Sequence, residues 1–519
     1  MKMQHVVSAL LMMGLILCPT LLTWGIDRAE EKPNILVILC DDLGYGDVQP
    51  LNPTSKIPTP TFNQLASQGM TFTDAHSPSA VCTPTRYGLI SGRYCWRSEL
   101  KRGVLGGYSR PLLKANQQTI ATVLKSVGYK TACVGKWHLG LGWQWSETAP
   151  NNINHFGIAG KPETVDYTKP LTDTPVSHGF DWSYIIPASL DMSPYVYIEN
   201  KDVTKPVKQV IESNPFPGFY RKGEVANDFS IEGCLDHLSE KAADFIRNQA
   251  NENQPFFLYV PLPAPHKPVM PTEAFKGQSK LGPYGDFIMQ VDAAIARIIQ
   301  TVDDTGQAKN TLVVVTSDNG SFMRRNDTEG FVDHVKDQKV QAFQSTNHRA
   351  NGPLRGTKAD IWEAGHRVPF LVRWPTKVKP GTRCDTTLCL VDLLATFADV
   401  TGANYDPKQS EDSFSLAKQL SNPNSPSVRP PVIHHSAAGM FAIRRGQWKL
   451  ILGNGSGGRQ APRGQAFGEP YHLMDLNQDL NEQNNVLTEN PQIKEQLISE
   501  FERISHKDHL PSNPKSKVP

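Results

Sequence analysis

The sequence predicts an α/β fold with a large, mostly parallel central β-sheet flanked by helices, plus a small C-terminal α+β subdomain with an antiparallel sheet. Two observations support this prediction. Several short apolar runs lack the alternation of period two that marks a half-buried strand, so they are typical of strands buried on both faces. Segments with helical periodicity lie between these runs, and such alternation of strand and helix indicates a parallel sheet.

Four apolar runs predict the central strands, and segments between or beside them predict helices. The strands are expected at residues 34–40, 131–134, 256–260 and 312–316, and the helices at residues 117–127, 235–247 and 287–302. Polar residues follow each strand. Ligands of such sheets bind beyond the carboxyl ends of the strands, so we expect these polar residues to converge on one site.

The pattern changes near the C-terminus. Residues 422–431 are rich in Pro, Ser and Asn and are typical of a linker. Residues 440–452 predict a hairpin that turns at Arg445-Gly446, and residues 471–476 and 491–504 predict a further strand and a terminal helix. The expected domains are a main domain over residues 33–425, the C-terminal subdomain over 426–510 and a disordered tail over 511–519.

The N-terminus is typical of a secretory signal peptide. Lys2 precedes an apolar run over residues 6–22, and polar sequence begins at Asp27. We expect a signal peptide over residues 1–25, cleaved after Gly25, although an uncleaved anchor is an alternative because the run approaches spanning length. No other segment is apolar enough for a stable membrane span. The protein is therefore expected to be secreted or periplasmic.

Composition excludes some partners and leaves the cysteines open. The 519 residues suit one large domain plus a smaller one. The net charge is +2 and no basic stripe is present, so we expect no nucleic-acid partner. Of eight cysteines, Cys384 and Cys389 are close enough in sequence to pair in an oxidising compartment. Burial of the cysteines as free thiols remains equally open.

Oxygen ligands for a metal ion follow two of the predicted strands. They are Asp41, Asp42, Asp318 and Asn319. Adjacent acids at a buried strand end repel unless a cation neutralises them. A site with many protein oxygens suits calcium better than magnesium, which keeps its waters. Either dipeptide alone is more typical of an ordinary turn, but together they predict a Ca²⁺ site, with Mg²⁺ the less favoured ion.

A second motif surrounds Cys82. Pro84 is suited to the first turn of a short helix that ends at Gly92, which places Cys82 at the helix N-terminus. Free backbone N–H groups favour an anion there, and Arg86 lies one turn further on the same face. The alternative is a small buried cysteine with a solvent-facing arginine.

With these motifs the chain resembles the type I (formylglycine-dependent) sulfatase family, which is arylsulfatase-like and belongs to the alkaline phosphatase superfamily. The resemblance covers residues 33–480 and centres on C-T-P-T-R at 82–86. The other blocks, in the family's order, are D-D-L-G at 41–44, S-G-R at 91–93, G-K-W-H-L-G at 135–140, P-H at 265–266, S-D-N-G at 317–320, L-R-G-T-K at 354–358 and E-A-G-H-R-V-P at 363–369. Thr83, Thr85 and Ala364 depart from the usual residues but leave the required Cys, Pro and Arg in place.

The resemblance implies an alkaline-phosphatase-like sheet and a nucleophile made from Cys82. A separate formylglycine-generating enzyme would convert this cysteine to formylglycine (3-oxoalanine), whose aldehyde hydrates to a geminal diol. One hydroxyl, bound to calcium, would attack sulfur. The implied metal ligands are Asp41, Asp42, Asp318, Asn319 and the converted Cys82.

The resemblance also implies roles for five further residues. Arg86, Lys136 and Lys358 would balance charge on the sulfate oxygens. His266 would protonate the leaving alcohol. His138 would take the proton of the second hydroxyl so that the hemiacetal expels sulfate. Considered without the motifs, Lys136 and Lys358 are more typical of solvated side chains. His138 is then typical of a core residue and His266 of a loop residue.

The implied reaction is hydrolysis of sulfate esters, of sulfated carbohydrates in nature and of aryl sulfates in an assay. Ser189, Asp191 and His366 are candidates for substrate contact, although His366 could equally cap a helix. The segments 151–220 and 321–351 lack an obvious structural pattern, and we expect them to shape the rim of the pocket.

The sequence disfavours two other functions. A metal-dependent phosphoesterase of the same superfamily would use Ser or Thr and two metals, which Cys82 and Lys358 disfavour. A catalytically retired binding protein would have lost a motif residue. The loss of any one of five residues would indicate such a protein, but all five are present, namely Cys82, Arg86, His138, His266 and Lys358.

Overall fold

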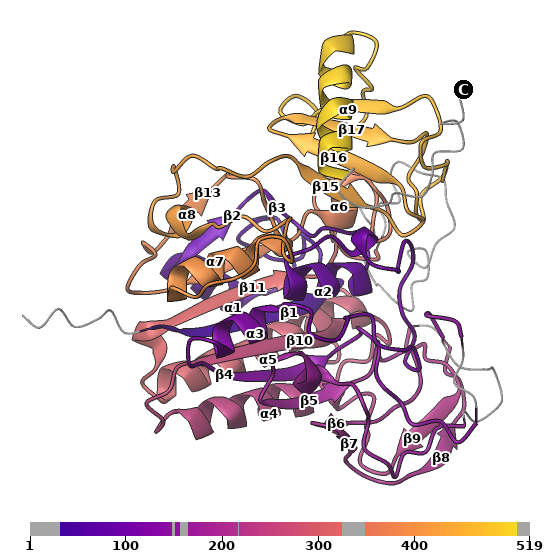
Figure 1. Cartoon of the computed structure of the whole chain (residues 1–519), viewed down its shortest axis with the longest axis vertical. Helices are drawn as coiled ribbons and strands as arrows, with labels where there is room; N and C mark the ends of the chain where they lie inside the picture. Colours follow the sequence, from indigo (N-terminus) through magenta and orange to yellow (C-terminus); the bar gives the residue numbers. More distant parts are fainter. Residues whose placement is uncertain (1–31, 148–150, 156–163, 216, 324–347, 506–519) are drawn as a thin grey trace, which may run out of the picture. The chain divides into compact units, whose positions relative to one another are not determined.

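A ten-stranded central sheet dominates the computed structural model, which describes residues 32–147, 151–155, 164–215, 217–323 and 348–505. Its strands are β1 (Asn34–Asp41), β2 (Met70–Phe72), β4 (Lys130–Lys136), β5 (Trp182–Ile186), β6 (Ile198–Glu199), β7 (Asp202–Val203), β10 (Phe256–Pro265), β11 (Thr311–Ser317), β12 (Phe370–Arg373) and β13 (Thr382–Cys384). Their order across the sheet is β13-β2-β12-β11-β1-β10-β4-β5-β6-β7 (Figure 1).

The centre of the sheet is parallel, as the sequence predicts. Strands β11, β1, β10, β4 and β5 run in one direction, and antiparallel pairs lie outside them. The register aligns the carboxyl ends of three neighbours. Cys40 of β1 pairs with Ser317 of β11, and Asp41 pairs with Pro265 of β10. The polar residues that follow these strands therefore emerge at one edge.

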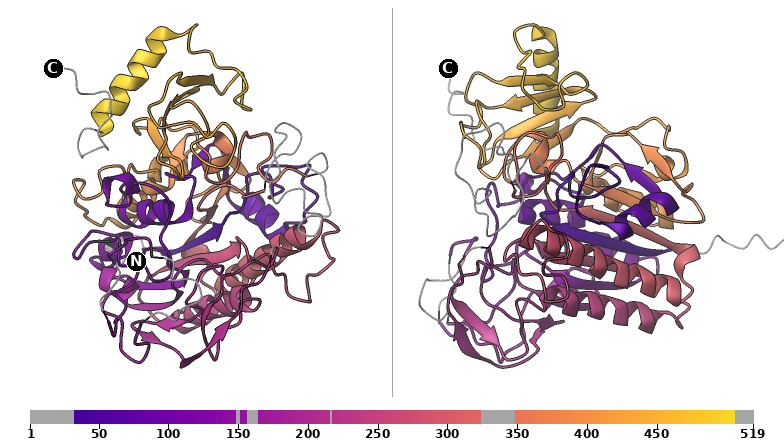
Figure 2. Two further views of the ribbon diagram at one scale, coloured as in Figure 1. Left: turned by 90° about the vertical axis from the view of Figure 1, so that its right-hand side faces the viewer. Right: turned by 180° about the vertical axis from the view of Figure 1, so that it is seen from behind.

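Helices cover both faces of the sheet (Figures 1 and 2). The helices on one face are α2 (Cys82–Ser91), α3 (Ile120–Lys125) and α7 (Leu393–Thr401), and those on the other are α1 (Pro60–Gln68), α4 (Cys234–Gln249) and α5 (Pro283–Asp304). Ile35, Val37 and Leu39 of β1 pack in the first layer, and Leu36 and Ile38 in the second. Because both faces of β1 are buried, its sequence is continuously apolar instead of alternating.

Several predicted boundaries shift in the structure. The helix expected at residues 117–127 is the shorter α3, because the side chain of Thr119 accepts a hydrogen bond from the backbone N–H of Thr122 and caps the helix there. The segment 151–220, expected to be irregular, contains β5 of the central sheet. This strand is five residues long and includes buried Ser183, so it lacked a clear apolar run. Most of the segment 321–351 lies outside the described residues.

The C-terminal region forms the predicted antiparallel sheet. Its strands are β15 (Val432–His435), β16 (Phe441–Arg445), β17 (Trp448–Leu452) and β18 (His472–Asp475), in that order, and the terminal helix is α9 (Pro491–Ser505). Leu497 and Phe501 of α9 pack in the same core as Phe441 and Leu450 of the sheet. The hairpin and the terminal helix expected from the sequence are thus confirmed.

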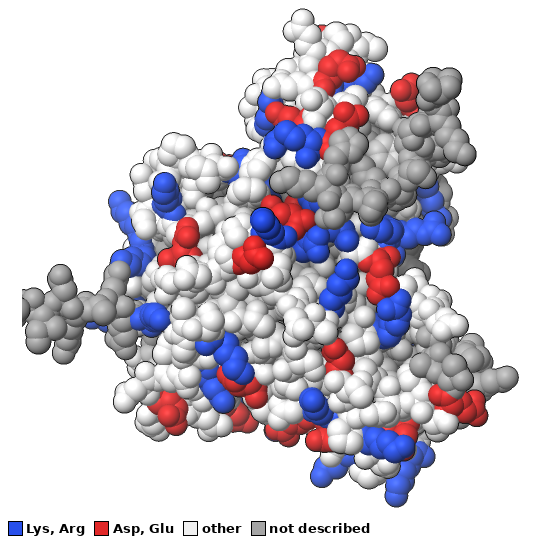
Figure 3. Space-filling view, in the orientation of Figure 1, with Lys and Arg blue, Asp and Glu red and all other residues white. Residues whose placement is uncertain are grey.

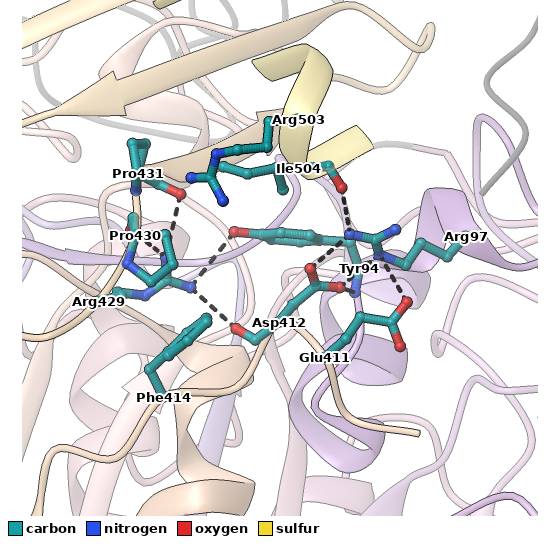
Figure 4. A pocket seen from close by; sticks show the side chains of 10 residues that line it. All are labelled: Tyr94, Arg97, Glu411, Asp412, Phe414, Arg429, Pro430, Pro431, Arg503 and Ile504. Carbon is teal, nitrogen blue, oxygen red and sulfur yellow. Dashed lines mark hydrogen bonds and ion pairs between the residues drawn. The ribbon is translucent and has the colours of Figure 1, made fainter. Parts of the chain in front are cut away.

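The side chain of Arg97 ties α9 to residues that precede the sheet (Figure 4). Arg97 donates hydrogen bonds to Asp412 (2.8 Å) and to the carbonyl of Ile504 (2.9 Å) near the end of α9. Arg429 donates to the hydroxyl of Tyr94 at 3.4 Å. A cation at a helix C-terminus satisfies a carbonyl that has no partner within the helix, so this small polar pocket anchors α9.

A buried charged network joins the C-terminal sheet to the short helix α6 (Glu363–His366). Lys449 of β17 is fully buried and contacts Glu363 at 3.1 Å and Glu482 at 2.8 Å. Arg444 of β16 pairs with Asp74 at 2.7 Å. Removing one partner of such a buried pair leaves an uncompensated charge and is strongly destabilising, so this network fixes the sheet against α6.

Three buried histidines, the histidine cluster, lie beside this network. They are His76 of β3 (Ala75–His76), His366 of α6 and His434 of β15. The rings of His366 and His434 stack with centroids 3.7 Å apart, and Nδ1 of His76 lies 3.1 Å from Nδ1 of His366. Burial lowers the pKa of all three, and the positive charge of Lys449 lowers those of His366 and His434 further. The cluster is therefore neutral near pH 7.

Other expectations concern the cysteines, the membrane and the surface. All seven cysteines in the described ranges are buried and free, so Cys384 and Cys389 do not pair. No helix within those ranges combines the length and apolar character needed to cross a membrane. On the face in Figure 3, basic and acidic side chains are interspersed and form no single patch of one sign.

The histidine cluster predicts how stability depends on pH. The folded-state pKa of each histidine is below the ordinary value of about 6.5, so the unfolded chain takes up protons first as pH falls. Stability present above about pH 6.5 is therefore lost below it. In His434→Phe, which keeps a ring for stacking, we expect the loss to be shallower by up to about 1.4 kcal/mol per pH unit. Urea denaturation at pH 5, 6, 7 and 8 tests this. Equal slopes for both proteins between pH 5 and 6 would contradict it.

Candidate active site

The site lies at the carboxyl edge of the parallel strands, where four strand ends and one helix N-terminus meet. Its residues are Asp41 and Asp42 at the end of β1, Lys136 and His138 at the end of β4, His266 after β10, Asp318 and Asn319 after β11, Cys82 and Arg86 of α2, and Lys358 from the segment before α6. Sequence reasoning named all of these residues, and the structure brings them together.

Cys82 is the first residue of α2 and is 2 % exposed. Its Sγ and one carboxylate oxygen each of Asp41 and Asp318 all lie within 4.8 Å of one another. The helix ends where Gly92 adopts a left-handed conformation with φ of 67°, which glycine accommodates without strain. Burial raises the pKa of the Cys82 thiol, and Asp41 and Asp318 oppose the lowering effect of the nearby lysines.

Three cations pair with the three carboxylates. Both Nε and Nη2 of Arg86 donate to Asp318 Oδ2, at 3.0 and 2.7 Å, and Nη1 donates to the carbonyl of Lys136 at 2.8 Å. The ammonium group of Lys136 donates to Asp41 Oδ2. A third pair joins Nζ of Lys358 to Asp42 Oδ1 at 2.7 Å.

The carboxyl groups keep different proton affinities. Burial alone would raise the pKa of Asp41, but Lys136, His266 and Arg86 together hold it below the ordinary value. For Asp318, burial and the negative charge of Asp41 raise the pKa more than Arg86 lowers it. The crowding of like charges is therefore only partly relieved by the cations.

Two buried oxygens of the site have no hydrogen-bond partner. They are Oδ1 of Asp41 and Oδ1 of Asn319, and both residues are fully buried. Asn319 directs its amide nitrogen to Asp42 Oδ1 at 2.6 Å, which leaves its amide oxygen facing away from that bond. An unpaired buried acceptor is costly, whereas a hard divalent cation coordinates oxygens of this kind. The donor set therefore suits a metal such as calcium or magnesium.

His138 has an unusual backbone and one bare nitrogen. Its φ is +58°, a left-handed conformation that is uncommon outside glycine. Its Nε2 donates to the carbonyl of Leu105 at 2.8 Å, so in the neutral ring Nδ1 carries the lone pair, and Nδ1 has no partner. Burial, Lys136 and Arg86 lower its pKa well below the ordinary value. The ring is thus a neutral proton acceptor.

His266, which follows β10, faces the carboxylate of Asp42. Its Nδ1 donates to the carbonyl of Lys267 at 2.6 Å, and its Nε2 lies 3.8 Å from Asp42 Oδ2. Burial and the charge of Lys358 lower its pKa well below the ordinary value. Without a bound anion the ring is neutral, and Nε2 is the atom that can gain a proton.

The three candidate substrate residues separate into two groups. Ser189 and Asp191 follow β5 and are each 1 % exposed, and the Ser189 hydroxyl and Asp191 Oδ1 have no hydrogen-bond partner. His366 belongs instead to the histidine cluster, where its ring contacts His76 and Lys449. Its ring nitrogens are committed to partners inside the protein, and we assign it no place among the residues around Cys82.

Three basic residues near Asp191 or its neighbour Lys267 were not singled out from the sequence. Arg221 and Lys267 face Asp191, and the charge of Arg459 acts on Lys267. Lys267 directly follows the motif histidine, and this adjacency was the one available signal. The pocket of Figure 4 is a different place, since none of the site residues lines it.

Comparison with known proteins agrees with this geometry. The family model described as Sulfatase matches residues 33–403. The N-acetylgalactosamine-6-O-sulfatase of Bacteroides thetaiotaomicron is 32% identical over 513 residues, which cover 92% of this chain and 93% of that protein. Arylsulfatase A of Homo sapiens is 30% identical over 472 residues, with 88% and 84% covered.

A solved structure shares the fold. It comes from work on the metabolism of multiple glycosaminoglycans by Bacteroides thetaiotaomicron and superposes with a TM-score of 0.78 at 30% sequence identity. The alignment covers 91% of this chain and 99% of that one.

The buried pairing predicts a large stability loss on removing Arg86. In Arg86→Leu, Asp318 keeps its burial but loses its bidentate partner, so we expect the free energy of unfolding to fall by about 3–5 kcal/mol in EDTA. Chemical denaturation measures this. Arg247→Leu is the control, because Arg247 pairs with Glu240 on an exposed surface and should lose at most about 1 kcal/mol. Equal losses in the two variants would refute the assignment.

Proposed function

The chain belongs to the sulfatase family and is a sulfuric ester hydrolase, and we propose that it hydrolyses sulfate esters of sulfated carbohydrates to the alcohol and inorganic sulfate. We further propose that its nucleophile is formylglycine made from Cys82 and that it binds a calcium ion. Aryl sulfates would serve as assay substrates.

The observation that carries this proposal is the setting of Cys82. It begins a helix amid three cations and a set of oxygen donors suited to a divalent ion. Burial raises the pKa of its thiol, so the unmodified side chain stays protonated at neutral pH and is a poor nucleophile. Formylglycine at this position would supply a hydrated aldehyde as the nucleophile, and calcium held by the oxygen donors would acidify its hydroxyl.

Charge in the site favours an anionic substrate. Three carboxylates face Arg86, Lys136 and Lys358, so the described site is balanced before a metal binds. A divalent cation held by Asp41, Asp42, Asp318 and Asn319 would leave a net charge of two positive units. A sulfate ester complements that charge, and the three cations can stabilise the charge that develops on its oxygens.

The two histidines suit opposite proton transfers. A bound sulfate ester brings negative charge near His266 and thereby raises the pKa of its ring, which prepares Nε2 to protonate the leaving alcohol. The bare Nδ1 of His138 can accept a proton in the step that releases sulfate, because its Nε2 is held as a donor by Leu105.

A carbohydrate substrate is supported by the relatives and by unpartnered polar atoms. One relative is named an N-acetylgalactosamine-6-O-sulfatase. Beside the site, the Ser189 hydroxyl and Asp191 Oδ1 are buried without a partner. Sugar hydroxyls and ring substituents can satisfy such groups.

Burial also bears on maturation and export. Because Cys82 is 2 % exposed in the folded protein, we propose that a formylglycine-generating enzyme acts before the chain folds. The signal peptide expected over residues 1–25 lies outside the described residues, and we propose that it directs the chain out of the cytoplasm to the periplasm or the medium.

The nucleophile can be tested by mass and by activity. In protein from its own host, the peptide that contains Cys82 should have the mass of an aldehyde in place of the thiol. Cys82→Ala should lower kcat for 4-methylumbelliferyl sulfate by at least about 1,000-fold, as loss of a nucleophile does. Cys234→Ala, at a buried cysteine of α4, is the matched control and should retain activity. An intact thiol in fully active protein would rule out this nucleophile.

Metal binding can be tested without activity. Calcium at about 100 times its dissociation constant should stabilise the folded protein by about 2.7 kcal/mol, seen as a rise in Tm over the EDTA-treated protein. Asn319→Ala removes one unpaired oxygen and should reduce this rise, whereas Asn63→Ala, at an exposed position of α1, should not. A calcium effect of equal size in all three proteins would argue against this ligand set.

A further inference from the structure

A cationic rim gathers around Lys267, beside Asp191. Arg221 lies just before β9 (Gly223–Ala226), Lys267 follows β10, and Arg459 lies in the connection between β17 and β18. Three segments that are distant in sequence thus place a basic side chain at one location. The side chains of Arg221 and Lys267 are 40% and 27% exposed, so they remain accessible to a ligand.

Two of these cations share one carboxylate and one aromatic ring. Nη1 of Arg221 lies 2.7 Å from Asp191 Oδ2, and Nζ of Lys267 lies 3.7 Å from the same oxygen. The backbone N–H of Arg221 also donates to the carbonyl of Asp191 at 3.2 Å. The ring of Phe219 lies 5.4 Å from the guanidinium carbon of Arg221 and 4.7 Å from Nζ of Lys267.

The backbone connects this rim to the catalytic residues. The carbonyl of Lys267 accepts the hydrogen bond from Nδ1 of His266 at 2.6 Å. The backbone N–H of Arg459 donates to Asp360 Oδ1 at 2.5 Å, two residues from Lys358. Burial lowers the pKa of Lys267, and the charge of Asp191 raises it. The nearby charges of Lys358 and Arg459 lower it further. The rim therefore lies next to His266 and Lys358 of the active site.

The rim cations are not needed to hold the scissile sulfate. Arg86, Lys136 and Lys358 already surround Cys82 and are 0%, 0% and 6% exposed. Arg221 and Lys267 face the one carboxylate of Asp191, and the charge of Arg459 acts on Lys267, so positive charges outnumber negative ones among these four residues, beside an apolar ring. Asp191 Oδ1 is also buried without a partner. An anionic sugar provides the complement, because its carboxylate or sulfate meets the cations and its hydroxyls can donate to Asp191.

We propose that Arg221, Lys267 and Arg459 form a second anion subsite, which binds a carboxylate or a further sulfate on the carbohydrate that carries the scissile ester. Asp191 accepts a hydrogen bond from a sugar hydroxyl there, and Phe219 supports the ring. The substrate class is accordingly a polyanionic glycan and not a neutral sugar with one sulfate. This inference rests on the proposed sulfatase function.

The test compares disaccharides that differ only in the second anion and uses an aryl sulfate as the reference. The probes are 4-methylumbelliferyl sulfate and three disaccharides. Each disaccharide has a hexosamine with the scissile sulfate, and its second sugar is neutral, is a uronate or bears a second sulfate. The calcium-loaded enzyme with formylglycine at position 82 is used. We expect kcat/KM to be highest for one or both anionic disaccharides and to fall with rising salt.

Charge-neutralising variants assign the subsite. Lys267→Met and Arg459→Met should each lower the ratio of kcat/KM for the anionic disaccharide to that for the aryl sulfate about tenfold, the scale of one charge-assisted hydrogen bond. Lys309→Met is the matched control, because Lys309 is exposed just before β11, at the opposite edge of the sheet, and its ratio should not change. Arg459→Met provides an independent answer if Lys267→Met does not fold.

The outcomes separate this inference from the proposed function. A loss confined to the uronate substrate assigns the subsite to a carboxylate, and a loss confined to the doubly sulfated one assigns it to sulfate. Sulfate release with unchanged ratios in both variants overturns the subsite and leaves the sulfatase function standing. No sulfate release from any probe, with formylglycine verified by mass, overturns the proposed function and this inference with it.

Discussion

Charge compensation at the carboxyl edge of the central sheet is the constraint on which the rest of the site depends. The register of β1 with β10 and β11 brings Asp41, Asp42 and Asp318 together in a buried place. Carboxylates this close and this buried are stable only with opposite charges beside them. Arg86 from a helix, and Lys136 and Lys358 from two other segments, supply those charges. The same three cations therefore neutralise the acids and can also bind an anion. A divalent cation would take over part of the neutralisation and so leave the cations available for the anion.

A second buried charged network has a different role. Lys449, Glu363 and Glu482 fix the C-terminal sheet against α6, and the histidine cluster fills the space beside them. The connection between β17 and β18 is anchored where Arg459 donates to Asp360, close to Lys358. The C-terminal sheet thus contributes Arg459 to the cationic rim beside the site.

Local sequence predicted the central elements well where burial is uniform. The runs that became β1, β4, β10 and β11 are apolar throughout because helices cover both faces of the sheet. Strand β5 was missed because it is short and contains a polar residue, and its place depends on pairing with β4. The helix α3 began later than its periodicity indicated because a threonine cap, and not the apolar pattern, sets its first turn.

The sequence by itself determined the fold class, the family and the residues at the strand ends, because motif residues there follow directly from short patterns in the chain. Tertiary structure alone decided which atoms are left without partners, such as Asp41 Oδ1, Asn319 Oδ1 and His138 Nδ1. It also placed His366 in a separate cluster and brought Arg221 and Lys267 to Asp191, with Arg459 near Lys267. These features depend on contacts between segments far apart along the chain, and no local pattern of residue types encodes the distances that create them.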